Sequence, residues 1–374
     1  NYINNVLLAE IKKDYSMTIN NQQGMKIIAL VTGGGPILSS SRAGISTAIC
    51  VDNATYIVDC GMGSIRNYRS HATWGELRGI FITHHHSDHI YDLGSYLFTG
   101  WQVPGESFSQ PIQIYGPGKP LQNPAMPAHS HPKIKGCCGG DHPMVGTAAM
   151  VDALIHNVFA SDIAIRMADE GRSSPTEWIK AFDIQIPEKA KADPVHNRHP
   201  QMEPFVIYED ELVKVSTILV DHRLCFPAFG FRFDSKYGSV VISGETTYSK
   251  NCILLAKDAD VLMHEVIDLD AILATFPEGP TRNGIAVHLE ESHTSYEKVG
   301  LVAQEANVKA LILHHIVPNT PDSADVQKMV NVAQNDFDGL VLAAEDNDTF
   351  NVIDIVKSRL EEGKARELIR EANI

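Results

Sequence analysis

The residues with the clearest chemical signal lie in one segment, Thr-His-His-His-Ser-Asp-His at residues 83–89. Imidazole and carboxylate groups are common ligands of transition-metal ions in proteins. His84 and His86 are two apart, so in an extended chain their imidazoles project to the same side. Asp88 and His89 come after the extended run should have ended. The four side chains therefore form two pairs that face different directions, which predicts two metal ions held close together.

The segments on either side of this motif predict the scaffold that positions it. A mostly apolar run over residues 77–83 predicts a buried strand that ends at the motif, and an apolar run over residues 90–98 is compatible with a helix. A histidine-rich surface loop is the alternative interpretation. Such a loop would need neither a buried strand leading into it nor a regular spacing of its histidines, so we favour the metal site.

The same arrangement, an apolar strand followed by a ligand-type residue, recurs in the second half of the chain. Predicted strands over residues 212–220, 239–243, 261–265 and 308–313 lead to His222, Glu245, the pair His264-Glu265, and His315, respectively. Active-site groups gather where several strand ends point the same way. We therefore expect these side chains at one edge of the fold, together with the motif.

The motif His84-x-His86-x-Asp88-His89, after a strand and before a helix, resembles the metal-binding motif of the metallo-β-lactamase superfamily. The resemblance implies an α/β fold, the αββα sandwich of that superfamily, and a dinuclear metal centre. The implied ligands are His84, His86 and His222 for one metal ion and Asp88, His89 and His315 for the other. Glu245 stands where the family normally has an aspartate that bridges both ions.

The ligand types and the glutamate bear on the identity and number of the metals. Imidazoles with carboxylates favour two zinc ions, and manganese or iron fits the same ligands. The extra methylene of Glu245 shifts its carboxylate by roughly 1.5 Å relative to an aspartate. The bridge then survives with shifted ions, or one site loses occupancy. The resemblance also gives Asp59 the role of orienting a ligand histidine, with capping of a helix near Ser64 as the alternative.

Two further residues resemble a pair found in the ribonuclease Z-like branch of the family. Glu265 would hold the tautomer of His293, and His293 would lie near the leaving group. Capping of a helix that starts near Ser295 is the alternative role for His293. The Gly-Gly-Gly-Pro turn at residues 33–36 and the Ser-Gly-Glu-Thr-Thr-Tyr-Ser run at residues 243–249 look most similar to bacterial arylsulfatase-like members.

The resemblance implies a metal-dependent hydrolase in which a metal-bound hydroxide, oriented by Asp88, attacks an ester of a small molecule. A sulfate ester or a phosphodiester is the favoured substrate. The alternatives are 3′ processing of transfer RNA, lactone hydrolysis, and a non-catalytic metal-binding role. The net charge of −15 disfavours nucleic acid as a partner, because nucleic-acid binding needs a basic surface. We also expect a homodimer.

A chain of 374 residues is long enough for one large domain with an insertion. We expect an N-terminal arm over residues 1–24 and a metallo-hydrolase domain formed by residues 25–116 and 205–374. Residues 117–204 are rich in Pro, Gly and His and are predicted to be an insertion over the mouth of the site, with one amphipathic helix over residues 148–168. No apolar run approaches the roughly 20 residues that span a membrane, so we expect no membrane partner.

The six cysteines leave the cellular compartment open. Cys137 and Cys138 lie in a Gly-rich loop beside Asp141 and His142, but no CxxC spacing supports a second metal site there. The chain begins at Asn1 rather than at a methionine, which fits either the removal of a leader, and hence a periplasmic or secreted protein, or a shortened chain.

Overall fold

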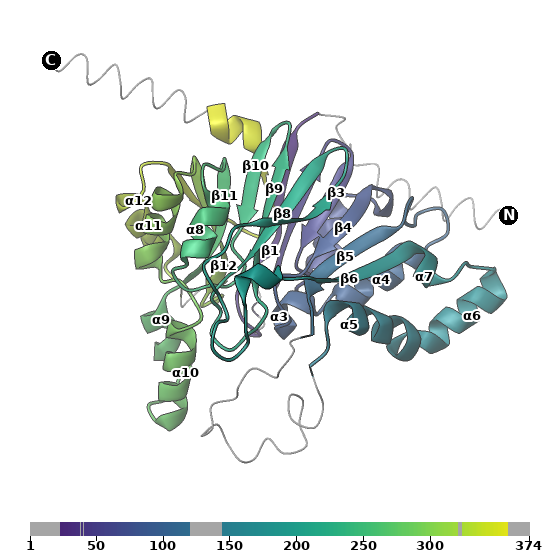
Figure 1. Ribbon diagram of the computed structural model, residues 1–374, viewed down its shortest axis with the longest axis horizontal. Coiled ribbons are helices and arrows are strands. Elements are labelled where there is room, and N and C mark those ends of the chain that lie inside the picture. Colours follow the sequence, from purple (N-terminus) through teal and green to yellow (C-terminus); the bar gives the residue numbers. More distant parts are fainter. Residues whose placement is uncertain (1–22, 38, 40, 120–143, 321–323, 358–374) are drawn as a thin grey trace.

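The computed structural model describes residues 23–119, 144–320 and 324–357, apart from residues 38 and 40. In this part of the chain, two seven-stranded sheets pack against each other, and helices cover their outer faces (Figure 1). The predicted αββα sandwich is therefore confirmed. The predicted N-terminal arm lies almost wholly outside the described residues, and Cys137 and Cys138 also lie outside them.

The first sheet has the strand order β14-β1-β2-β3-β4-β5-β6. Its strands are β1 (Met25–Thr32), β2 (Ile45–Val51), β3 (Ala54–Val58), β4 (Leu77–Phe81), β5 (Ile112–Pro117), β6 (Ile179–Ile184) and β14 (Asp348–Asn351). Strands β14 and β1 to β3 pair antiparallel, whereas β3 to β6 pair parallel. The carboxyl ends of β3 and β4 therefore open onto the same edge.

The second sheet repeats this design, with the order β13-β12-β11-β10-β9-β8-β7. Its strands are β7 (Phe205–Glu209), β8 (Val213–Leu219), β9 (Phe229–Ser235), β10 (Gly238–Ile242), β11 (Val261–Ile267), β12 (Ala310–Val317) and β13 (Leu340–Ala343). Strands β7 to β10 pair antiparallel and β10 to β13 pair parallel. The parallel strands β10, β11 and β12 bring their carboxyl ends together.

The core between the sheets explains why the strands are nearly continuous apolar runs. Phe81 of β4 packs edge-on against Phe233 and Phe231 of β9, with ring centroids 5.3 and 5.8 Å apart, and against Tyr208 of β7 at 5.7 Å. The inner faces bury these rings and the outer faces are covered by helices. Strands buried on both faces lose the alternation of apolar and polar residues.

The helices divide between the two outer faces (Figure 1). Those with the first sheet are α2 (Ser64–His71), α3 (Ser87–Ile90), α4 (Leu93–Gln102), α5 (Thr147–Ala153), α6 (Ala160–Glu170) and α7 (Pro175–Trp178). The second sheet carries α8 (Lys250–Ala256), α11 (Tyr296–Ala306) and α12 (Val326–Asn335). A hairpin of α9 (Leu269–Ala274) and α10 (Pro280–Glu290) extends away from the sandwich, and none of the residues of α10 is buried.

The described part of residues 117–204 is more closely joined to the sandwich than an insertion over the site would be. Its strand β6 extends the first sheet by pairing with β5, and the hydroxyl of Thr147 in α5 lies 2.8 Å from Nε2 of His85. Strand β6 was missed because Lys180 and Asp183 interrupt its apolar pattern. A strand at the edge of a sheet tolerates such residues, since part of its surface faces water.

The single helix predicted over residues 148–168 is wrong. Helix α5 continues into a π-helical segment, Leu154–Val158, and α6 then starts in a direction 65° away. Phe159 lies at the break with φ −99° and ψ 4°, and its ring stacks on Phe98 with centroids 5.1 Å apart. A π-bulge with an anchored aromatic residue is a recognised cause of such a kink. Among the described residues no single helix has the length and apolarity to cross a membrane, although this bent pair passes the test by length and composition together.

Candidate metal centre

The seven side chains predicted as metal ligands gather where strand ends of the two sheets meet. They form two groups that share Glu245, and within each group the potential ligand atoms lie within 4.8 Å of one another. The groups are His84, His86, His222 and Glu245, and Asp88, His89, His315 and Glu245. The division of the histidines matches the one that the resemblance implied. These clusters suit a dinuclear metal site.

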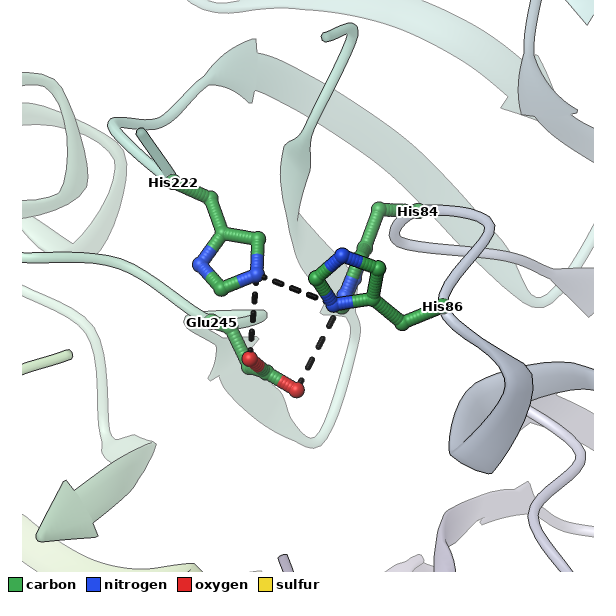
Figure 2. A group of neighbouring side chains, drawn as sticks. All are labelled: His84, His86, His222 and Glu245. Atoms are coloured by element: carbon green, nitrogen blue, oxygen red, sulfur yellow. Dashed lines mark hydrogen bonds and ion pairs between the residues drawn. The ribbon is translucent and has the colours of Figure 1, made fainter. Parts of the chain in front are cut away.

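In the first group, three imidazoles surround one carboxylate (Figure 2). Nε2 of His222 lies 3.1 Å from Oε2 of Glu245 and 3.2 Å from Nδ1 of His86. Nε2 of His84 is buried and has no hydrogen-bond partner among the described residues; its distance to Oε1 of Glu245 is 3.7 Å. A buried nitrogen without a partner is costly. A cation among these atoms would remove that cost, so the residues fit a metal ion.

In the second group, the other oxygen of the same carboxylate is the central atom. Oε1 of Glu245 lies 2.5 Å from Nε2 of His89 and 2.7 Å from Nε2 of His315. Oδ2 of Asp88 lies 3.6 and 3.5 Å from the same two nitrogens. Glu245 thus reaches both groups despite its extra methylene: Oε2 lies near His222 of the first group, and Oε1 lies near His89 and His315 of the second as well as 3.7 Å from His84.

The electrostatics of the centre follow from burying carboxylates among imidazoles. Burial raises the pKa of Glu245, but the facing imidazoles, His315 foremost, outweigh it and hold this pKa well below its usual range. Burial lowers the pKa of His222 to about 3, so at neutral pH this imidazole is in the neutral form that binds metals. Burial opposes protonation of His315 as well, but Glu245 and Asp88 raise its pKa to about 10.

Two residues at the centre have an unusual backbone. Asp59, just after β3, has φ 61°, and His315 in β12 has φ 45°, a region that residues other than glycine seldom adopt. The pairing of β11 with β12 shifts register at this point. The triple-glycine turn lies beside it: a Cβ on Gly34 would approach the His315 ring to 2.7 Å, and the N–H of Gly35 donates to Oδ2 of Asp88 at 3.1 Å. The turn therefore packs directly against the second group.

Asp59 makes the contacts expected of a residue that orients a ligand. Its Oδ2 lies 2.7 Å from Nδ1 of His89 and accepts from the hydroxyl of Thr83 at 2.8 Å, while Oδ1 accepts from the N–H of Thr83. The N-cap of α2 is Gly63, so Asp59 does not cap that helix. With Nδ1 held in this way, Nε2 of His89 faces Glu245.

Asp59→Asn is expected to weaken metal affinity about 10–100-fold, the usual cost of losing the partner that orients a ligand histidine. Competition with a chromogenic chelator measures this on protein first stripped of metal. Asp52→Asn is the matched control, because that carboxylate lies in the turn between β2 and β3 and binds the N–H of Gly24. An equal loss of affinity in both variants would contradict the orienting role.

Glu265 and His293 lie beside the two groups. Oε1 of Glu265 accepts from the N–H groups of Thr294 and Thr246 at 2.8 and 3.3 Å, and Oε2 lies 3.3 Å from Nδ1 of His293. Nε2 of His293 then lies 3.6 Å from Oε2 of Glu245. Burial disfavours the charged imidazole, but Glu265 outweighs it and raises the pKa of His293. The N-cap of α11 is Ser295, so His293 does not cap that helix.

Some contacts at the centre have no signal in the sequence. Nδ1 of His222 donates to the carbonyl of Ser292 at 2.9 Å, and any residue could supply that carbonyl. His264 belongs to neither group; its Nδ1 lies 2.7 Å from the carbonyl oxygen of Glu265. Cys137, Cys138, Asp141 and His142 lie outside the described residues.

The sequence of this chain is similar to those of known metal-dependent proteins. Residues 42–106, which include the histidine motif, match the model of the metallo-beta-lactamase superfamily. The ribonuclease Z of Mycobacterium marinum is 27% identical over 292 residues, covering 78% of this chain and 86% of that protein.

Two solved structures share the fold. Human tRNase Z, short form, has a TM-score of 0.53 and 19% identity, over 87% of this chain and 99% of that one. The metallo-beta-lactamase fold protein YhfI of Bacillus subtilis has a TM-score of 0.55 and 16% identity, over 88% and 100%. The motif, the sandwich and the two ligand groups agree with these likenesses. The chain contains a metallo-beta-lactamase superfamily domain, matched over residues 42–106, and is a metal-dependent hydrolase.

Proposed function

We propose that this hydrolase cleaves phosphodiester bonds of RNA, with 3′ processing of transfer RNA precursors as its reaction. The observation that carries the proposal is the Glu265–His293 pair, which places an imidazole whose pKa is raised by Glu265 beside two metal-ligand groups. The relatives named ribonuclease Z add support over most of the chain's length. They favour this reaction over the sulfate ester that the arylsulfatase-like turns indicated.

The chain's own residues divide the chemistry as follows. Two divalent cations in the ligand groups would supply an activated water and stabilise charge on the phosphoryl oxygens. Asp88, held by the N–H of Gly35, is placed to accept the proton of the attacking water. His293 keeps its Nδ1 toward Glu265, which leaves Nε2 to donate a proton to the departing oxygen.

A small-molecule ester, either a sulfate or a phosphodiester, is the second candidate. The chain carries a net charge of −15, and a polyanion such as RNA gains affinity from basic side chains. A compact ester would not need them. Hydrolysis of such an ester would use the same metal centre. The two candidate functions differ only in the part of the substrate that lies outside that centre.

The metal-loaded protein should bind two metal ions per chain and shorten a transfer RNA precursor with a 3′ trailer at one position. Elemental analysis gives the metal count, and gel electrophoresis of end-labelled precursor gives the cut site. Bis(p-nitrophenyl) phosphate and p-nitrophenyl sulfate are tested in parallel. Removing the metals with a chelator should abolish cleavage, and adding them back should restore it.

Each substrate tests one candidate function, and the metal content tests the ligand groups. Turnover of the sulfate with an intact precursor would replace the RNA proposal by the small-molecule one. A metal content near one would mean that Glu245 supports only one site. A content near zero would remove the assignment of the ligand groups.

A further inference from the structure

A cavity of about 310 Å³ lies next to the metal centre, and His293 forms part of its wall. None of the seven proposed metal ligands lines this cavity. It is therefore a separate compartment that meets the centre at the residue proposed to protonate the leaving group. Its position makes it a candidate for holding the part of the substrate next to the departing oxygen.

Three segments far apart in the sequence build the cavity. The turn after β10 contributes Tyr248, the ends of the α9–α10 hairpin contribute Asp270 and Glu290, and the first turn of α11 contributes Tyr296. The hairpin leaves the sandwich at this point (Figure 1). Each tyrosine is held by a second contact: the Tyr248 hydroxyl donates to Glu305, and Nζ of Lys328 lies 4.6 Å from the centre of the Tyr296 ring.

The lining is aromatic and rich in hydrogen-bond acceptors. Its carboxylate residues are Asp268, Asp270, Glu290 and Glu297, and its lysine is Lys298. The buried Oγ of Ser295 has no hydrogen-bond partner among the described residues. Nζ of Lys328 lies 3.4 Å from Oδ2 of Asp268 and offsets that charge, but the lining keeps an excess of negative charge, which disfavours phosphate. It suits a planar ring that carries N–H donors.

We propose that this cavity binds the nucleobase next to the scissile bond of an RNA substrate, a step that rests on the proposed function above. Single-stranded RNA is commonly recognised by splaying a base out, stacking it on an aromatic side chain and bonding its polar edge. Here Tyr248 and Tyr296 supply the aromatic surface and the carboxylates accept from exocyclic amino groups. Adenine and cytosine carry such an amino group, and uracil does not. The phosphates remain outside, toward the metal centre.

Binding of free nucleosides tests the cavity without any need for turnover. Saturation-transfer NMR with adenosine, cytidine and uridine on the full chain should show contact to the base protons of the first two and weaker contact to those of uridine. Tyr296→Ala should weaken cytidine binding about 10-fold or more, as expected for loss of one stacked base. Tyr296→Phe keeps the ring and should retain most of the affinity.

Phe182→Ala is the matched control, because Phe182 is an exposed aromatic residue on β6 and does not line the cavity. Circular dichroism checks that each variant is folded. Inorganic phosphate at the same concentration should not displace cytidine, because carboxylates outnumber ammonium groups in the lining.

Three results would overturn the inference: no nucleoside binding by the unaltered chain, equal losses in Tyr296→Ala and Phe182→Ala, or displacement of cytidine by inorganic phosphate. Failure here is separable from failure of the proposed function. Cleavage of the transfer RNA precursor by the unaltered, metal-loaded protein tests the reaction itself, whatever the cavity binds.

Discussion

His293→Ala is expected to slow hydrolysis of a diester with an alkyl leaving group by about 10²–10⁴-fold, the contribution of one well-placed acid. A nitrophenoxide departs without a proton, so the same variant should lose far less rate on a nitrophenyl diester. His293 lies outside both ligand groups that share Glu245, so metal content and fold should be retained. Initial rates on the two diesters, with elemental analysis of the same samples, measure the effect.

The control and the partner residue sharpen this test. Glu265→Gln should show the same dependence on the leaving group, but more weakly, because Glu265 acts through the imidazole. His71→Ala removes a partly exposed histidine on α2, whose Nε2 lies 3.1 Å from Oδ1 of Asn347, and should change neither rate. Equal losses on both diesters, or loss of metal from His293→Ala, would make His293 a ligand. A third cluster in the structure, Glu265, His293 and His315, is the set that it would then join.

Glu245→Gln is expected to cost more metal affinity than any change outside the ligand groups. One oxygen of Glu245 faces His222 and the other faces His89 and His315, so removing its charge weakens both sites at once. Removing a residue that only orients a ligand already lowers metal affinity about 10–100-fold. We therefore expect Glu245→Gln to lower metal affinity more than about 100-fold. Calorimetric titration of the metal-free variant measures it.

Glu245→Asp should by contrast be tolerated, because a shorter carboxylate can still reach between the groups. Glu211→Gln, which alters an exposed carboxylate paired with Arg78, is the control and should bind two metal ions normally. If Glu245→Gln keeps full affinity at both sites, Glu245 does not bridge. Activity that falls sharply in Glu245→Asp while metal content holds would also argue against bridging.

The sequence alone determined the local elements that depend on apolar patterning. Strands such as β4, β10 and β11 were predicted within a few residues of their observed ends, because burial on both faces requires continuous apolar runs. The helix after the motif and the ligand types of the motif were also readable, because they depend on spacing within one short segment. Edge strand β6 and the bend at Phe159 were not, since each depends on the neighbours that the segment meets.

The sequence marked His222, Glu245 and His315 as ligand-type residues at strand ends, and only the tertiary structure decided how near they lie to one another. Their positions are separated by more than 20 residues. The parallel pairing of β10, β11 and β12 brings the strand ends at Glu245 and His315 together. Strand β8, which leads to His222, is antiparallel to β9 and therefore runs in the same direction as β10. The left-handed backbone at Asp59 and His315 is likewise set by surrounding contacts, because no intrinsic preference of aspartate or histidine demands it. The cavity beside His293 arises in the same way. It forms where a turn, a hairpin and the first turn of a helix come into contact. Local sequence patterns do not predict such contacts between segments that are far apart in the chain.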